Sequence, residues 1–132
     1  VYSDDPKDLS NMSHDDFFDV YKQALQNSYT RLKPNRFGVV VTSEVRGKKG
    51  EYIGLVPKTI QFMQDAGYQL WNELILVNSA GTLPLRAGKS MHASRKVGRM
   101  HQNVLVFYKG NPKAIKDMGN VVGTFGEEHA DA

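Results

Sequence analysis

The sequence contains no cysteine, and this absence limits the chemistry that the chain can perform. Without cysteine there can be no disulfide bond, no thiolate zinc site and no cysteine nucleophile. The absence is compatible with a reducing compartment, so we expect a cytoplasmic protein. No run of about 18 apolar residues occurs, and the sequence therefore predicts no membrane-spanning helix. The four histidines are not spaced as pairs of metal ligands, and we expect no metal site.

Acidic residues are missing from one long interval of the chain. Between Glu73 and Asp117 the sequence has eight Lys and Arg residues but no Asp or Glu. The other nine of the 17 basic residues share the rest of the chain with all 14 acidic residues, so that remainder is net negative. This distribution is typical of a surface that faces a polyanion on an otherwise acidic body. A solvated loop with ordinary lysines would give the same pattern, and charge alone leaves both interpretations open.

Hydrophobic periodicity predicts two helices and three strands in what the length of 132 residues suggests is one domain. Apolar residues recur at helical spacing over residues 13–34 and 54–67. Ser13 is the expected N-cap of the first helix, and Gly67 is the expected C-cap of the second. Short apolar runs predict strands at 36–45, 68–78 and 101–110.

The order of these elements predicts an α/β fold that contains part of a doubly wound sheet. The helix between the first two strands implies that these strands pair in parallel. The near-continuous apolar run of the first strand is typical of a strand covered on both faces. The sequence predicts no helix between the second and third strands, so we expect them to form a terminal antiparallel hairpin. Residues 111–132 are polar and are expected to form a tail with one helical turn.

Residues 79–100 are predicted to form a long basic loop before the third strand. Loops of this length inside a compact domain are usually functional or disordered. The cations of residues 79–100 can neutralise phosphates, and the small residues of this segment let its backbone approach DNA closely. A mobile surface loop that is cationic for solubility is the alternative. The candidate DNA-binding residues are Arg86, Lys89, Arg95, Lys96 and Arg99.

Three stretches of the sequence carry a resemblance to a known enzyme family. They are "VYSDDPKDLSNMSHDDF", "RFGVVVTSEVRGKKGEYIGLV" and "GTLPLRAGKSMHASRKVGRMHQNVLVFYKG". With them the chain resembles the C-terminal part of phage and prophage DNA amino-methyltransferases, which transfer a methyl group from S-adenosylmethionine to adenine N6 or cytosine N4. The resemblance implies a partial Rossmann-like methyltransferase sheet. It also implies that residues 1–110 belong to the catalytic domain, that residues 79–100 contact DNA, and that residues 111–132 are a tail.

The chain departs from that family in two motifs. The family's catalytic tetrapeptide, Asp/Asn/Ser-Pro-Pro-Tyr or -Phe, should stand shortly before Val1, and "DDPK" at residues 4–7 is not a degenerate copy of it. The glycine-rich cofactor turn is also absent from the sequence. The resemblance therefore implies S-adenosylmethionine for the parent enzyme. For this chain alone we expect no cofactor, no catalytic residue and no activity.

The resemblance also implies a pocket for an extruded base, because methylation of an exocyclic amine requires the base to leave the stack. His101, Gln102 and Asn103 open the last strand and are expected to line this pocket. Glu44 and Tyr52, which follow the first strand, are further candidates. As alternatives, the first three residues would bond at a strand edge, Glu44 would pair with Arg46, and Tyr52 would be an ordinary exposed tyrosine.

Two functions related to that family are compatible with these observations, and a third, weaker interpretation is an unrelated small α/β nucleic-acid-binding module. The chain, which begins at Val1 rather than at a methionine, is expected to be a C-terminal segment of a DNA amino-methyltransferase that contacts DNA and walls the base pocket. The alternative is a stand-alone, non-enzymatic DNA- or protein-binding remnant of such an enzyme. We expect DNA as a partner, and no membrane. The missing N-terminal half or a second copy would cover exposed sheet edges, because unpaired edges invite association.

Overall fold

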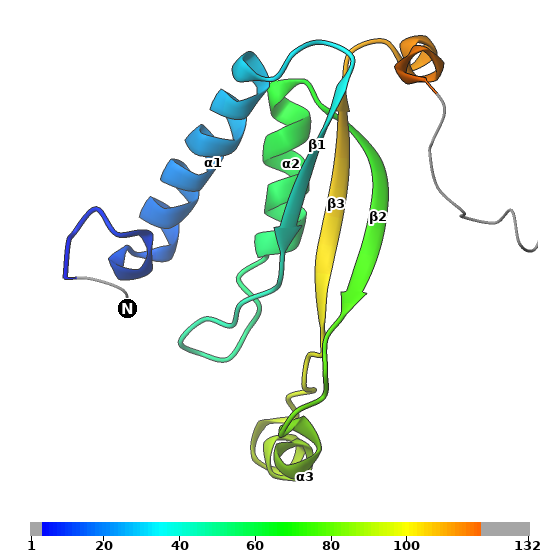
Figure 1. The fold of residues 1–132 in the computed structure, drawn as a ribbon. Coiled ribbons are helices and arrows are strands. Elements are labelled where there is room, and N and C mark those ends of the chain that lie inside the picture. The colour runs from blue at the N-terminus through cyan, green and yellow to red at the C-terminus, as the bar shows by residue number, and fades with distance from the viewer. Residues whose placement is uncertain (1–3, 120–132) are drawn as a thin grey trace, which may run out of the picture.

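The computed structural model describes residues 4–119, and Figure 1 shows two long helices on one side of a three-stranded sheet. The predicted order of helices and strands is confirmed. An additional helix occurs where a loop was predicted, and residues 120–132 of the predicted tail lie outside the described part. In residues 4–119 no helix is both long and apolar enough to cross a membrane. The elements are η1 (Leu9–Asn11), α1 (His14–Arg31), β1 (Arg36–Thr42), α2 (Leu55–Ala66), β2 (Gln69–Val77), α3 (Leu83–Ser94), β3 (His101–Lys109) and η2 (Pro112–Met118).

Helix α1 is bounded by side chains that satisfy its terminal backbone groups. Ser13 is the N-cap, as predicted, and its hydroxyl oxygen accepts a hydrogen bond from the Asp16 N–H at 3.2 Å. At the other end the ammonium group of Lys109, from β3, donates to the carbonyls of Leu32 (2.6 Å) and Tyr29. A cation suits the negative end of a helix dipole. One cation of the carboxylate-free interval therefore holds α1 against the sheet.

Helix α2 is fixed at both ends by specific residues. The Glu44 carboxylate accepts hydrogen bonds from the N–H groups of Leu55 (3.1 Å) and Val56 (3.0 Å) in the first turn. Gly67 ends the helix at φ 118°, as predicted, and a side chain there would be strained and would meet the Tyr29 ring at 2.9 Å. The conformation and the close approach both require glycine at this position.

The strand order is β1-β3-β2, and β3 runs antiparallel to both neighbours. The predicted hairpin of β2 and β3 is confirmed. The predicted parallel pairing of β1 and β2 is wrong, because β3 lies between them. The crossover through α2 does make these two strands run in the same direction. The crossover leaves room for one strand between β1 and β2, and β3 occupies this position.

The hydrophobic core lies between α1, α2 and one face of the sheet. Leu105 and Phe107 of β3 have no exposed surface and pack with Met63 of α2 and Tyr68. Two hydroxyl pairs add polar links within this layer, Tyr21 with Thr59 (2.7 Å) and Ser28 with Tyr68 (3.0 Å). Buried polar groups of this kind are tolerated because each has a partner.

The opposite face of the sheet carries exposed apolar side chains, although both faces of β1 were predicted to be covered. Val39 and Val41 of β1 are 57% and 53% exposed, and Leu74 and Leu76 of β2 are 52% and 48% exposed. Successive residues of a strand point to opposite faces, so Val40 packs on the core while its two neighbours point away. The prediction of double coverage is therefore wrong for the described residues. We call this surface, with Val39, Val41, Leu74 and Leu76, the bare face.

Candidate nucleic-acid interface

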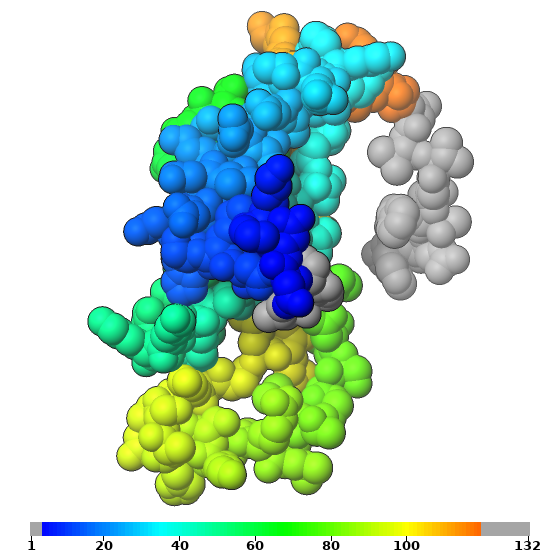
Figure 2. Space-filling model, turned by 90° about the vertical axis from the view of Figure 1, so that its left-hand side faces the viewer, coloured from blue at the N-terminus to red at the C-terminus, as the bar shows by residue number. Residues whose placement is uncertain are grey.

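Residues 79–100, which we call the basic arm, contain helix α3 rather than only irregular loop. Pro84 lies in the first turn of α3, where a missing N–H costs little. The helix ends at Arg95, which has φ 56° and whose N–H donates to the Met91 carbonyl at 3.0 Å. No described side chain of α3 is buried. Figure 2 shows the arm, coloured green to yellow, projecting beyond the rest of the molecule.

A pocket of about 310 Å³ lies between the basic arm and the segment that follows β1. We call it the arm pocket. Three of the predicted DNA-binding residues, Arg86, Lys96 and Arg99, line it together with Arg46. The other two, Lys89 and Arg95, are exposed on the arm and do not line this pocket. The guanidinium of Arg95 donates to the carbonyls of Met91 (2.8 Å) and His92 (3.5 Å) and thereby supports the end of α3.

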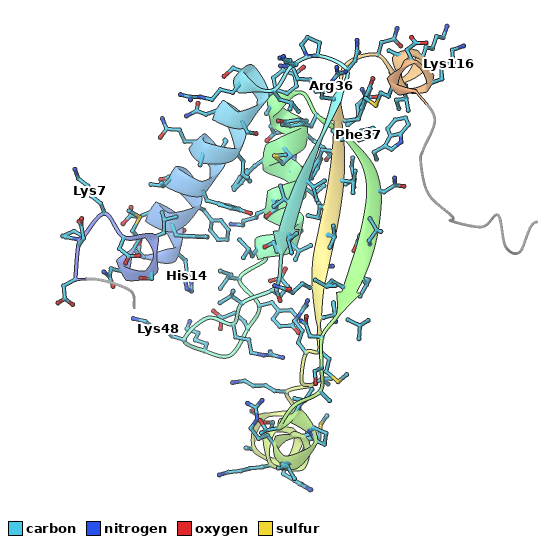
Figure 3. The ribbon with its side chains drawn as sticks, in the orientation of Figure 1. Lys7, His14, Arg36, Phe37, Lys48 and Lys116 are labelled. Carbon is cyan, nitrogen blue, oxygen red and sulfur yellow. The ribbon has the colours of Figure 1, made fainter. Side chains whose placement is uncertain are left out.

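A tight turn after β1 brings Arg46 and Tyr52 into the wall of the arm pocket. The two residues face each other in an antiparallel bridge, and Gly47 donates its N–H to the Glu51 carbonyl at 2.7 Å. The Arg46 guanidinium lies over the Tyr52 ring at 4.5 Å from its centroid and donates to the Gly50 carbonyl at 2.8 Å. In Figure 3 Lys48 marks this turn, on the side of the sheet where the arm begins. We call residues 45–53 the hairpin turn.

Arg46 was missed as a site residue in the sequence, where it was considered only as a partner for Glu44. In the structure Glu44 lines the arm pocket, but its two carboxylate oxygens accept the α2 hydrogen bonds described above. The signal that could have identified Arg46 is its spacing from Tyr52 across a glycine-containing polar segment, which is typical of a tight turn. The predicted role of Glu44 and Tyr52 in base binding stays a prediction.

Two of the three polar residues that open β3 meet at the edge of the arm pocket. Arg99 donates one hydrogen bond to the Asn103 side-chain oxygen (3.2 Å) and is 3.1 Å from Nε2 of His101. The Asn103 amide in turn donates to Glu73 at 3.1 Å, and Asn103 is only 8% exposed. Gln102 pairs with Leu76 on the opposite face of the strand. The structure thus brings His101 and Asn103 to the pocket's edge and places Gln102 on the bare face.

The arm pocket is positively charged. Four cationic side chains line it, namely Arg46, Arg86, Lys96 and Arg99, and Glu44 is the one carboxylate among its lining residues. Converging cations raise the local concentration of anions and attract polyanions. Within residues 4–119 no group of three or more histidine or carboxylate side chains could hold a metal ion.

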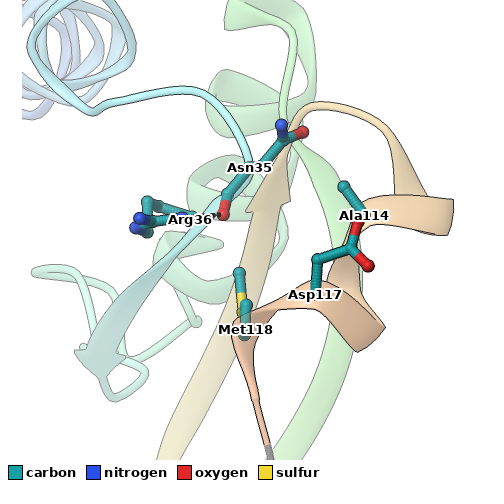
Figure 4. A pocket seen from close by; sticks show the side chains of 5 residues that line it. All are labelled: Asn35, Arg36, Ala114, Asp117 and Met118. Atoms are coloured by element: carbon teal, nitrogen blue, oxygen red, sulfur yellow. Dashed lines mark hydrogen bonds between the residues drawn. The ribbon is translucent and has the colours of Figure 1, made fainter.

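A second cavity, of about 490 Å³, lies at the opposite end of the sheet (Figure 4). Asn35 and Arg36 at the start of β1 line it together with Ala114, Asp117 and Met118 of η2. It contains none of the residues that the sequence predicted to bind DNA or a base, and Arg36 and Asp117 give it charges of both signs. The arm pocket is therefore the stronger candidate for binding a polyanion.

Comparison with known proteins gives one solved structure with a similar fold. No protein-family model matches the chain, and no curated protein matches it. The similar structure is that of a candidate DNA modification methylase from Thermus thermophilus, with a TM-score of 0.58 and 12% sequence identity. The match covers 87% of this chain and 43% of the other protein, so the chain spans less than half of its length. At this identity the likeness shows that the mixed α/β fold of this chain also occurs as a part of that larger protein.

Proposed function

We propose that this chain is the C-terminal segment of an S-adenosylmethionine-dependent DNA amino-methyltransferase of the phage type, with adenine N6 or cytosine N4 as its target. The single observation that carries this proposal is the position of the basic arm, which forms a cationic pocket with the hairpin turn at one end of the sheet. The shared fold with a candidate DNA modification methylase supports it. Residues 1–110 then belong to the catalytic domain and residues 111–132 form a tail. We place the protein in the cytoplasm, in line with its lack of cysteine.

In this proposal the segment supplies DNA contacts and one wall of the base pocket, while the preceding half supplies the chemistry. That half carries the Pro-Pro-aromatic tetrapeptide, binds S-adenosylmethionine and completes a doubly wound, Rossmann-like sheet. Its strands are expected to pair with β1, which has one strand neighbour, β3, among the described residues. Its helices are expected to cover the bare face, whose exposed apolar side chains would otherwise remain in water.

A stand-alone DNA-binding remnant is the second candidate, and one observation favours it. The described residues form a core of their own, with Leu105 and Phe107 fully buried and both ends of α1 and α2 satisfied by specific contacts. Such a core is compatible with folding in the absence of another half. This candidate differs from the first in that no methyl transfer is expected, even when the chain is mixed with a methyltransferase half.

The DNA contact is tested by fluorescence anisotropy of a labelled duplex titrated with the 132-residue chain at several salt concentrations. We compare the double variant R86Q/K89Q, on the arm, with R36Q/K116Q, a matched loss of two charges at the far end of the sheet (Figure 3). The arm variant should bind more weakly, and the slope of log affinity against log salt should fall by up to about two units, since each phosphate contact contributes about 0.9. Equal loss in both variants, or affinity that ignores salt, would contradict the proposed arm contact.

Complementation separates the two candidate functions. The chain is mixed with a separately expressed methyltransferase half that carries the Pro-Pro-aromatic tetrapeptide, and transfer of labelled methyl groups to DNA is measured. The first function predicts transfer only when both halves are present. The second predicts DNA binding by this chain without any transfer.

A further inference from the structure

We propose that the arm pocket is a specific phosphate-binding site built by Arg46, Lys96 and Arg99 around the ring of Tyr52. The inference rests on the proposed function in so far as DNA is its natural source of phosphate. The group that binds is a phosphate, and Arg46 and Tyr52 take part in binding it. The arm as a whole would then contact DNA through exposed cations, and this pocket would receive one particular phosphate.

Two guanidinium groups from distant parts of the chain converge on one aromatic ring. Arg46 lies 4.5 Å and Arg99 5.5 Å from the centroid of Tyr52. Arginine side chains within about 6 Å of a ring centroid are attracted by the negative face of the ring. The ring therefore holds two like charges in the same region, and Glu44 is the one carboxylate among the residues that line the pocket. An anion is the ligand that such a pair can bind.

Arg99 is oriented so that part of its guanidinium remains for a ligand. Its Nη1 group makes both contacts described above, one to Asn103 and one to His101. Because a guanidinium only donates, His101 must accept through Nε2. No described residue accepts a hydrogen bond from Nε or Nη2 of Arg99, and these groups form the planar edge that binds two phosphate oxygens.

Asn103 fixes the orientation of the Arg99 guanidinium. It is nearly buried, and its amide is held by Glu73 of β2. The Arg99 guanidinium is thus supported by a chain of hydrogen bonds that begins at Glu73 in the sheet. An ordinary surface arginine would lose side-chain entropy when it binds a ligand, whereas Arg99 loses less because it is already held in place. Asn103 and His101 act here as positioning residues, since they contact Arg99.

Lys96 closes the pocket by packing against the hairpin turn. A Cβ atom on Gly50 would lie 2.9 Å from Cε and 3.1 Å from Nζ of Lys96, so the absence of a side chain at Gly50 allows the arm to approach. The ammonium group thereby lies beside Gly50, whose carbonyl accepts a hydrogen bond from the Arg46 guanidinium. Lysine then adds a third positive charge that can contact any phosphate oxygen.

The pocket of about 310 Å³ is open to solvent and can accept a phosphate that carries substituents. A phosphodiester of the DNA backbone and a free phosphate present the same anionic oxygens. We assign the site to the shared phosphate chemistry, and the ligands used in the test distinguish the two sources.

The test is an NMR titration of the full 132-residue chain, read out on the arginine Nε–H signals. The ligands are the dinucleotide TpT, its methylphosphonate analogue, which lacks the negative charge, and inorganic phosphate. We expect the Arg99 and Arg46 signals to shift with TpT and not with the methylphosphonate. Shifts with inorganic phosphate but not with TpT would support the site and identify free phosphate as its ligand.

Variants make the assignment specific. R99Q should weaken TpT binding about tenfold, the loss expected for one charge-assisted hydrogen-bonded contact, and Y52L should weaken it by a smaller factor. R36Q, an arginine at the far end of the sheet, should leave it unchanged. The inference is overturned if the Arg99 signal moves with neither phosphate ligand, if the methylphosphonate acts like TpT, or if R99Q binds as well as the wild type. If duplex affinity still falls in K89Q, whose lysine does not line the arm pocket, the proposed DNA contact of the arm stands without this site.

Discussion

At the scale of single residues, cations of the carboxylate-free interval serve two different purposes. Lys109 satisfies carbonyls at the end of α1, whereas Arg99 and Lys96 line the arm pocket. The sequence could predict the second group because it lies in a long polar segment. It could not separate Lys109 from that group, since the contact joins β3 to a helix far away in the chain.

Replacing Lys109 by methionine should destabilise the fold. The substitution keeps much of the side-chain bulk but leaves the carbonyls of Tyr29 and Leu32 without their donor. We expect a loss of about 1–3 kcal/mol in the free energy of unfolding, measured by urea denaturation. Lys113→Met, at an exposed position, is the control and should change it by less than about 0.5 kcal/mol. Equal effects of the two substitutions would show that the ammonium contacts contribute nothing.

At the scale of elements, α1, α2 and the three strands could be predicted because each has a periodic apolar pattern and clear end signals. Helix α3 was not predicted, because the glycines, the proline and the many cations of residues 79–100 indicated a loop. The hairpin turn was not predicted as part of a site, apart from Tyr52. Its meeting with the arm, and hence the approach of Arg99 to the Tyr52 ring, depends on tertiary contacts that no local pattern encodes.

Gly88→Ala should stabilise α3 without disturbing its surroundings. Gly88 lies inside the helix, and a Cβ atom there would meet no other atom within 4 Å. Alanine favours the helix over glycine by about 0.5–1 kcal/mol. Hydrogen exchange of the arm amides should slow accordingly, while affinity for duplex DNA is retained. Faster exchange in the variant would indicate that the arm needs the freedom of glycine at this position.

At the scale of the whole molecule, the sheet has one covered and one bare face. The first strand could be predicted as apolar on both sides, but the sequence could not show which side α1 and α2 cover. The central place of β3 was also missed, because strand order depends on pairings between segments far apart in the chain. The doubly wound architecture stays a proposal, as does the longer enzyme that would contain it.

Substitutions in β1 should distinguish the two faces. Val39→Lys adds a charge to the bare face and should change the thermal midpoint of the chain little, since Val39 is 57% exposed. Val40→Lys should unfold the chain or lower its midpoint strongly, because Val40 packs against the core. In the complementation assay Val39→Lys should reduce assembly with the other half. Similar midpoints for the two variants would contradict the assignment of the covered face.

The central position of β3 has a consequence for biosynthesis. All the ladder hydrogen bonds of β1 and β2 are made to β3, the last strand in the described part of the chain. While the ribosome is still translating the arm, both earlier strands lack β3 and expose the backbone groups that later bond to it. The nascent polypeptide is therefore prone to aggregate or to recruit chaperones during this interval, and β1 and β2 gain their shared neighbour only after residues 101–109 have emerged from the exit tunnel.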